Sequence, residues 1–427
     1  MTTRRNFLIA GSAALAGPAI LRSPVLADDK TPPPSERVTM GFIGVGGQGS
    51  GNLGAFLNDP RVQVVAICDV DKNHLARGLE MAKLPPEAGY GDWRELIARD
   101  DIDAVMIATP DHWHAIITTA AARAGKDIYC EKPLASSIGE GRHVSNVIKE
   151  TKRVLQCGTW RRSSIHTRMG CEWVRNGYIG TLEKIEVAVP GVFGIQGDYT
   201  GSEPATEPPV ELDYAMWQGP SKPLPYRAGS VHFNFRWVNQ YAPGYITDWG
   251  AHFLDVAQWG NGTDDTAPIE VEAADVKSRS NSYYDAPEKF RIDYKYANGV
   301  KMTMISTDNA ELWGTKFIGS EGSVFSENTK LITEPKSLRT VKLKDSDLKL
   351  YDSPQHHRNF IDCVLSRKLE TAATAEAAHR AATCCHIAAI AATLKRPLKF
   401  DPIAETFDDP AANAYLMPKM NGGWKLS

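Results

Sequence analysis

The pattern of apolar and polar positions divides the chain into two parts with different repeats. In the first part, short apolar runs rich in β-branched residues alternate with longer stretches of helical period. The runs that predict strands lie at 38–45, 62–69, 103–109, 127–131 and 154–158. Because strands and helices alternate, this part is predicted to be a doubly wound α/β domain with a parallel sheet. Its predicted bounds are residues 37–159.

After about residue 160 the pattern changes to one typical of an open, mostly antiparallel sheet in a second α/β domain, 160–427. A helical stretch and a strand-like run come first, followed by an irregular segment dense in Pro, Gly, Trp and Tyr, at 164–176, 182–189 and 190–245. Strands are then predicted at 269–280, 288–297, 299–306, 314–319 and 323–326. Asn298 and Gly299 form a tight hairpin turn between two of them. The last helices are predicted at 355–366 and 374–395, the second capped by Thr374.

Composition and charge favour a two-domain protein that acts on small molecules. The chain has 427 residues, of which 42% are hydrophobic and 23% are charged, as in ordinary globular proteins. Its net charge is −3, with 48 basic and 51 acidic side chains and no long block of like charge. These values do not predict a basic surface that would bind nucleic acid or an anionic membrane. No segment after the first 27 residues predicts a stable membrane span.

The N-terminal residues 1–27 resemble a twin-arginine (Tat) export signal. Arg4 and Arg5 precede a mild apolar run, and small residues at Val25 and Ala27 suit a cleavage site. The third basic residue often found after the arginine pair is absent, because Ile9 stands there. A membrane anchor is the alternative, but the apolar run is too short to span a bilayer. We expect a Tat signal peptide, the Tat export machinery as a partner, a linker at 28–36, and a periplasmic or secreted protein.

Neither the cysteines nor the histidines predict a metal site. Seven cysteines are odd in number, contain no Cys-x-x-Cys and lie in core-like segments, which favours buried free thiols over disulfides or zinc. His112 and His114 form a His-x-His pair at the start of a helix, without a second ligand group at a recognisable spacing. Helix capping or cofactor packing is the preferred interpretation of this pair.

A glycine-rich turn follows the first predicted strand and precedes a helix. It contains Gly-x-Gly-x-x-Gly, in which small residues let the backbone approach a pyrophosphate at the helix N-terminus. The candidate contacts are Gly44, Gly46, Gly47, Gln48 and Gly49. Asp69 ends the next strand 25 residues after Gly44, where its carboxylate can accept hydrogen bonds from a ribose. Asp69 would repel a 2′-phosphate, so NAD is favoured, while Lys72 and Arg77 keep NADP open.

Further candidates follow two later strands and occupy the same edge of the predicted sheet, where such sheets bind ligands. Thr109, Pro110 and His114 follow the third strand, and Glu131 and Lys132 follow the fourth. All five are candidate cofactor contacts. In the second part, Asp248 and His252 lie four residues apart, so on one helix they would face the same way. The carboxylate could then hold the imidazole tautomer and form an acid/base unit with it.

In combination these motifs resemble the Gfo/Idh/MocA family of nicotinamide-dependent oxidoreductases over roughly residues 37–405. The likeness rests on the glycine turn, on Glu131-Lys132-Pro133 and on Asp248-x-x-x-His252. The segments 111–114 and 247–252 are similar to a secreted, Tat-signalled branch of the family. The resemblance implies a Rossmann domain and a second domain whose open sheet covers the active site and often forms a homo-oligomer interface.

The resemblance also implies roles for the matching residues. His252 would be the general acid/base on a substrate hydroxyl, Asp248 would orient it, and Lys132 would bridge substrate and nicotinamide. Histidine titrates near neutrality and suits this proton transfer, and a nearby cation stabilises alkoxide charge. In 190–245, flat rings lie beside hydrogen-bonding groups, which is what a carbohydrate needs. The candidate substrate-binding residues are Arg162, Arg236, Trp237 and Tyr241.

Three hypotheses for function remain open. The first is an oxidoreductase acting on a sugar or polyol hydroxyl, with tightly bound nucleotide because little free NAD exists outside the cytoplasm. The second is an NAD-dependent glycosidase similar to glycoside hydrolase family 109, which oxidises a sugar transiently. Those enzymes generally lack the lysine of Glu-Lys-Pro, so Lys132 favours the first hypothesis. The third is a non-catalytic nucleotide- or sugar-binding protein, which would be expected to lose His252 or Lys132.

Overall fold

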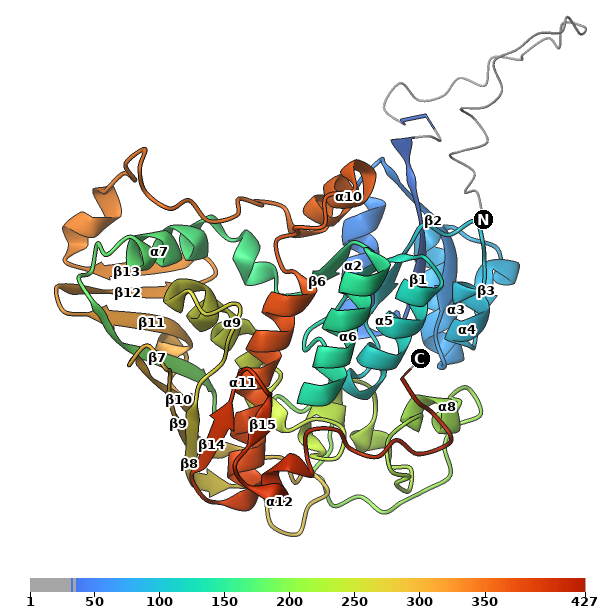
Figure 1. The fold of residues 1–427 in the computed structure, drawn as a ribbon. Helices are drawn as coiled ribbons and strands as arrows, with labels where there is room; N and C mark the ends of the chain where they lie inside the picture. The colour runs from blue at the N-terminus through green and yellow to red at the C-terminus, as the bar shows by residue number, and fades with distance from the viewer. Residues whose placement is uncertain (1–31, 34–35, 427) are drawn as a thin grey trace, which may run out of the picture.

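The computed structural model describes residues 32–33 and 36–426, and these form two domains, each built on one sheet (Figure 1). The predicted signal peptide, 1–27, and most of the predicted linker, 28–36, lie outside the described residues. Among those described, no helix combines the length and the apolar character needed to cross a membrane.

The first domain is a six-stranded parallel sheet, which confirms the predicted α/β fold class. Its strand order is β3-β2-β1-β4-β5-β6. The bounds are β1 Val38–Ile43, β2 Val62–Cys68, β3 Gly89–Tyr90, β4 Ala104–Ile107, β5 Asp127–Cys130 and β6 Leu155–Cys157. The order reverses between β1 and β4, and in open sheets of this kind ligands bind beyond the strand ends at that point.

Helices cover the first sheet and begin at its ligand-binding edge. Their bounds are α2 Gly47–Leu57, α3 Lys72–Ala82, α4 Trp93–Ile97, α5 Asp111–Arg123 and α6 Ile138–Thr151. Asp71 and Ser137 cap α3 and α6 through their side chains. The first turn of α2 has no side-chain cap and no acidic residue. Its free backbone N–H groups therefore point toward the glycine turn.

The second domain contains a nine-stranded sheet in the order β13-β12-β11-β7-β10-β9-β8-β14-β15. Neighbouring strands are antiparallel except β7 and β10, which are parallel. The bounds are β7 Leu182–Pro190, β8 Glu270–Lys277, β9 Lys289–Lys295, β10 Lys301–Thr307, β11 Gly314–Gly319, β12 Gly322–Glu327, β13 Lys330–Glu334, β14 Leu398–Asp401 and β15 Thr406–Phe407. The predicted Asn298-Gly299 turn joins β9 to β10, with Gly299 at a φ of +90°.

Three helices pack on one face of the second sheet, and α9 carries His252 into the space between the domains. They are α7 Ile165–Arg175, α9 Gly250–Asn261 and α11 Ala375–Leu394. Thr374 caps α11, as predicted. The shorter helices are α8 Tyr214–Gln218 and α12 Pro410–Asn413, and the 3-10 turns are η2 Pro86–Ala88, η3 Trp160–Ser163, η4 Ala228–Ser230, η5 His232–Trp237, η6 Gly244–Ile246, η7 Ala310–Leu312 and η8 Lys336–Thr340.

The C-terminal part of the chain returns to the first domain. Helix α10, His356–Ser366, packs on α2 and β1, where the Phe360 ring lies 6.1 Å from Phe56 and 5.9 Å from Tyr129. Further on, the Trp424 ring lies 4.7 Å from Trp113. The two domains are therefore joined by packing as well as by the chain between them.

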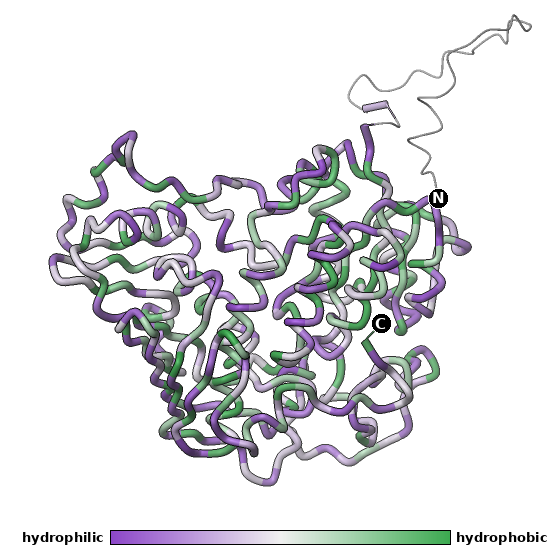
Figure 2. The backbone as a smooth tube through the Cα atoms, in the orientation of Figure 1, coloured by the Kyte–Doolittle hydropathy of each residue, from purple (hydrophilic) through white to green (hydrophobic). Residues whose placement is uncertain are grey.

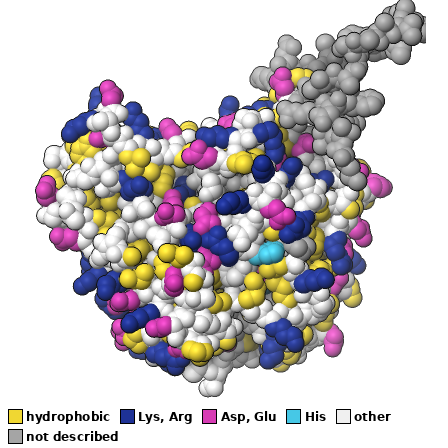
Figure 3. Space-filling view, viewed as in Figure 1, with side chains coloured by type: hydrophobic (Ala, Val, Ile, Leu, Met, Phe, Trp, Pro, Cys, Tyr) yellow, Lys and Arg dark blue, Asp and Glu magenta, His cyan; other side chains and the backbone are white. Residues whose placement is uncertain are grey.

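The distribution of side chains agrees with a globular interior and a mixed surface. Hydrophobic segments concentrate inside both domains, while outlying loops are mostly hydrophilic (Figure 2). On the face shown in Figure 3, basic and acidic side chains are interspersed. All seven cysteines are free and buried, as the sequence predicted.

Candidate active site between the two domains

A cavity of about 850 Å³ lies between the domains and receives residues from both. One end is lined by the glycine turn and Asp69, and the other by Lys132, Asp248 and His252. The structure therefore brings the predicted nucleotide contacts and the predicted catalytic residues together in one space.

The glycine turn is built by close backbone approach. Gly44 has a φ of +79°, and a Cβ added there would lie 2.8 Å from the Ala108 carbonyl group. A Cβ on Gly49 would lie 2.0 Å from the Gly44 carbonyl oxygen, whereas Gly47 faces open space. Gly49 does not line the cavity, so it serves the packing of helix on strand rather than direct contact.

The residues at this end fit a dinucleotide. The uncapped start of α2 faces the cavity through Gly47 and Gln48, where backbone N–H groups favour a pyrophosphate. The buried Thr109 Oγ1 has no hydrogen-bond partner among the described residues, although it lines the cavity. Asp69 accepts hydrogen bonds from the Val45 and Asp71 N–H groups, at 2.8 and 2.9 Å, which fixes the orientation of its carboxylate in the cavity wall.

Other predicted cofactor contacts line the cavity but also hold its turns together. His114 Nδ1 lies 2.6 Å from the Pro133 carbonyl oxygen, and Nε2 lies 2.9 Å from that of Thr109. Glu131 accepts hydrogen bonds from Asn52 at 2.9 Å and from Gln48 at 3.4 Å. These contacts connect the ends of β1, β4 and β5, with Pro110 beside them. The predicted residues therefore line the cavity, while most of their polar atoms already have protein partners.

Lys132 lies at the centre of a charged cluster formed by both domains. Its Nζ donates to Asp248 Oδ1 at 2.7 Å and to the Asp248 carbonyl oxygen at 2.9 Å. Arg236 Nε donates to the same carboxylate oxygen at 3.1 Å. Asp248 therefore holds Lys132 and Arg236 side by side at the cavity wall.

The expected pairing of Asp248 with His252 is wrong. Asp248 precedes α9, which begins at Gly250, and its carboxylate turns toward Lys132 and Arg236. In the described part of the chain, the buried His252 Nδ1 has no hydrogen-bond partner. The two cations attract the carboxylate more strongly than a neutral ring does. His252 lines the cavity without being paired to Asp248.

The pKa values of both Asp248 and His252 lie below their ordinary values. Burial alone would raise the pKa of Asp248, but Lys132 and Arg236 outweigh it and hold that pKa well below the usual range. Burial, together with the positive charges of Lys132 and Arg161, lowers the pKa of His252 well below its ordinary value. At neutral pH the site therefore contains a carboxylate and a neutral imidazole that can accept a proton.

Asp111 is a member of the cluster that the sequence did not single out. It begins α5 and lines the cavity. Burial raises the pKa of Asp111 to about 7, against the lowering effect of Arg236 and Lys132. A carboxyl group that titrates near neutrality in a cavity is a candidate functional group.

Aromatic and basic side chains surround His252 at the far end of the cavity. The Trp160 ring lies 5.9 Å from the His252 ring, and Phe233 and Trp249 also line this end. Arg161 is only 4% exposed, contacts the cavity and bonds Glu327 at 3.0 Å. Flat rings with a few charged groups suit a hydroxylated ring.

Three of the four predicted substrate contacts do not line this cavity, and only Arg236 does. Arg162 is buried against Asp255 and Asp264, which bond its guanidinium at 2.7 to 2.9 Å, so it is a structural ion pair. Trp237 stacks on Phe193 with ring centroids 4.5 Å apart. Tyr241 is also buried, and its hydroxyl accepts a hydrogen bond from Gln218 at 3.1 Å.

Comparison with protein-family models decides the family. Residues 38–159 match the oxidoreductase family NAD-binding Rossmann fold, and residues 164–426 match the oxidoreductase family C-terminal alpha/beta domain. The chain belongs to the Gfo/Idh/MocA family of oxidoreductases.

Similar proteins carry the names of two different enzyme classes, glycosyl hydrolase and oxidoreductase. A glycosyl hydrolase family 109 protein of Shewanella pealeana is 29% identical over 43% of this chain, and the match spans only 45% of that relative. An uncharacterized oxidoreductase of Bacillus subtilis, YrbE, is 24% identical over 73% of this chain and 80% of its own length.

Solved structures share the fold at lower identity. A levoglucosan dehydrogenase in complex with NADH and levoglucosan has a TM-score of 0.62 at 18% identity, covering 85% of this chain and 99% of that chain. An aldose-aldose oxidoreductase from Caulobacter crescentus, complexed with glycerol, has a TM-score of 0.62 at 15% identity, covering 85% and 100%. At these identities the likeness establishes the fold.

Proposed function

We propose that this family member oxidises or reduces a CH–OH group of a sugar or polyol, with NAD as the favoured cofactor and NADP as the alternative. The observation that carries the proposal is the cavity itself. It joins a glycine turn suited to a dinucleotide with a half-buried, neutral His252 near Lys132. A purely nucleotide-binding protein has no need for these groups at the far end.

The chemistry divides between the cofactor and the chain. A bound nicotinamide would supply the hydride acceptor. His252 accepts the hydroxyl proton, because its ring is neutral and lines the cavity. Lys132 stabilises negative charge on the oxygen, and Asp248 positions the Lys132 ammonium at 2.7 Å.

Several contacts support tight retention of the nucleotide. The segment before α8 crosses to the start of α3, where Lys72 N–H donates to the Glu211 carbonyl oxygen at 2.9 Å, and Asp213 N–H donates to that of Val70 at 3.0 Å. Trp113, which lines the cavity, contacts Trp424 of the C-terminal segment. We propose that both act as covering segments that slow nucleotide release, because they contact Val70 and Trp113, which line the cavity.

A retained nucleotide also suits an exported enzyme. Tat export carries folded proteins, so a chain with the proposed signal peptide at 1–27 can acquire its nucleotide in the cytoplasm. We place the mature enzyme in the periplasm or outside the cell, where recycling within the site avoids dependence on free NAD. Export is tested by following the full-length protein in fractionated cells with and without the twin-arginine pair.

Carbohydrate is the proposed substrate class. Trp160, Phe233 and Trp249 provide apolar faces, and Lys132, Arg161 and Arg236 provide donors. Support comes from the solved neighbours that bind levoglucosan or carry the name aldose-aldose oxidoreductase. The exposed face of the second sheet, opposite α9, is the proposed surface for a homo-oligomer.

A second candidate function is glycoside cleavage through transient oxidation. The similarity to a glycosyl hydrolase family 109 protein favours it, although that match covers less than half of the relative. The same proton transfer at His252 would serve both reactions. Retention of Lys132 favours net oxidation or reduction.

The test is a screen of sugars and glycosides with the protein purified together with its bound nucleotide. The proposal expects a sugar-dependent change in reduced-nicotinamide absorbance. Release of a reducing sugar from a glycoside, without a net change in nicotinamide redox state, would favour the glycosidase instead. A chain that binds no nicotinamide nucleotide and transforms no carbohydrate would contradict both.

A further inference from the structure

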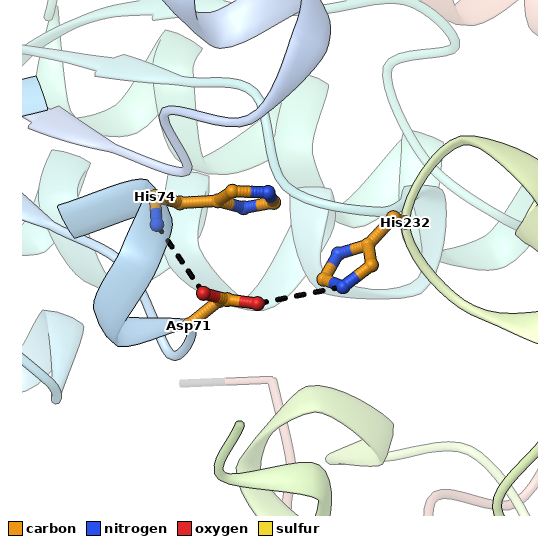
Figure 4. Close-up of side chains that lie close together, drawn as sticks. All are labelled: Asp71, His74 and His232. Carbon is orange, nitrogen blue, oxygen red and sulfur yellow. Dashed lines mark hydrogen bonds and ion pairs between the residues drawn. The ribbon is translucent and has the colours of Figure 1, made fainter. Parts of the chain in front are cut away.

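Three metal-ligating side chains meet at the edge of the cavity and have no part in the proposed reaction. Asp71 caps α3, His74 lies in its first turn, and His232 begins η5 of the second domain (Figure 4). One ligand atom from each residue lies within 4.8 Å of the others. We infer that Asp71, His74 and His232 bind a divalent transition metal, with Zn²⁺ as the best chemical match.

The spacing of two of these ligands already suits a tetrahedral ion. His232 Nε2 lies 3.4 Å from Asp71 Oδ2. Two ligand atoms bound to Zn²⁺ at about 2.0–2.1 Å, at a tetrahedral angle, are about 3.4 Å apart. His74 is the third ligand, and its ligand atom lies within 4.8 Å of the other two.

Surrounding groups orient the ligands. Asp71 Oδ1 accepts hydrogen bonds from the Asn73 and His74 N–H groups at 2.8 and 3.2 Å, which leaves Oδ2 directed at the histidines. Behind the His74 ring, Asp69 Oδ2 lies 3.6 Å from Nδ1. A carboxylate in this position fixes the tautomer of a metal-ligating histidine and leaves Nε2 for the ion.

An ion can reach this position from the cavity. His74 and His232 both line it, with side chains 18% and 39% exposed. A fourth coordination position would open toward the cavity, where water or a nucleotide oxygen can enter. His232 has a φ of +52°, an uncommon conformation for a non-glycine residue that directs its ring toward Asp71.

The ligands come from two domains, and this gives the ion a specific consequence. Bound metal would connect α3 of the first domain to η5 of the second across the mouth of the cavity, next to Asp69. Opening of the domains would then break metal–ligand bonds. The site goes beyond the proposed reaction and does not depend on it, because neither His252 nor Lys132 takes part.

The experiment is a titration of the chelator-treated protein with Co²⁺, followed by visible absorbance and by competition with Zn²⁺. The expected result is one Co²⁺ per chain, displaced by one equivalent of Zn²⁺. His232→Ala and His74→Ala should each weaken Co²⁺ binding by more than about tenfold. Asp71→Asn keeps an oxygen for the α3 cap and should also weaken binding, so it tests the ligand without removing the cap.

The matched control is His166→Ala, which removes a histidine of α7 that lies outside the cavity. It should bind Co²⁺ as the unaltered protein does. Circular dichroism and thermal unfolding establish that each variant is folded. Absence of Co²⁺ binding to the unaltered protein, or equal binding by folded His232→Ala and His166→Ala, would overturn the metal site. Either result leaves the sugar oxidoreduction to be judged by its own assay.

Discussion

His252 and Lys132 are the two residues on which the proposed chemistry depends. Neighbouring residues fix the position of each of these two side chains. Asp248 fixes Lys132, while α9 places the half-buried His252 beside Trp160. The pair therefore separates proton transfer from charge stabilisation, and the two roles can be tested independently.

The pH dependence of oxidation should reflect a neutral His252. The pKa of this group is lowered by burial and by Lys132, so the accepting form persists well below its ordinary value of 6.5. The rate constant kcat/KM should stay high as pH falls through about 6.5 and decline only at lower pH. His252→Ala should lower kcat by about 10²–10⁴-fold with nucleotide retained. Unchanged turnover of every accepted substrate would refute the assignment.

Lys132→Met should cause a severe loss of kcat without loss of nucleotide. Methionine keeps the length of the side chain but removes the charge that stabilises the oxygen. Single-turnover kinetics and nucleotide analysis after acid release measure the two effects separately. If the variant is purified without nucleotide, Lys132 is mainly a cofactor anchor.

Asp111 should contribute the alkaline limb of the same pH profile. Its pKa is raised to about 7 by burial, so it becomes negatively charged as pH rises through that value. This charge lies near Lys132 and opposes negative charge on the substrate oxygen, so kcat/KM for oxidation should fall. Asp111→Asn should remove the fall, and a wild-type profile that is flat around pH 7 would contradict this role.

At the scale of elements, the 3-10 turns explain why the sequence did not predict which of their residues line the cavity. With about three residues per turn, neighbours point in different directions. In η5, Phe233 and Arg236 line the cavity, whereas Asn234 and Trp237 are buried. Longer elements with regular apolar repeats were predicted well, including the Thr374-capped helix. Strands β3 and β15 are too short to carry a repeat.

Arg161 and Arg162, which are adjacent in η3, should differ in function because only Arg161 lines the cavity. Arg162→Met should lower the free energy of unfolding by about 3–5 kcal/mol, because it leaves the fully buried Asp255 without its partner. Arg161→Met should destabilise less, since its partner Glu327 is 30% exposed, but it should raise KM. Chemical denaturation and steady-state kinetics measure both. If Arg162→Met instead raised KM and Arg161→Met caused the larger loss of stability, Arg162 rather than Arg161 would be the substrate contact.

At the scale of the whole molecule, the site exists only because distant segments meet. Helix α10 and the C-terminal segment return to the first domain, and the segment before α8 crosses to α3. The sequence revealed the two sheets and the nucleotide turn through local patterns. It did not reveal that Asp248 pairs with Lys132, because 116 residues separate them.

The covering segments should control nucleotide release. Trp424→Ala removes ring contacts with Trp93 and Trp113, which line the Asp69 end of the cavity. The rate of nucleotide dissociation should increase, with little change in single-turnover chemistry. Tyr415→Ala, which alters an exposed ring of the same C-terminal region, is the control. Equal dissociation rates for both variants would contradict the role of the cover.

The most direct measurement is a single-turnover reaction on protein purified with its own nucleotide. The nucleotide is identified by chromatography, and sugars are added without further cofactor while reduced-nicotinamide absorbance is followed. The account predicts a bound nicotinamide dinucleotide and an absorbance change of about one equivalent per chain with an accepted sugar, absent from His252→Ala. A bound nicotinamide that stays unchanged while a glycoside is cleaved, or an equal change in His252→Ala, would contradict it.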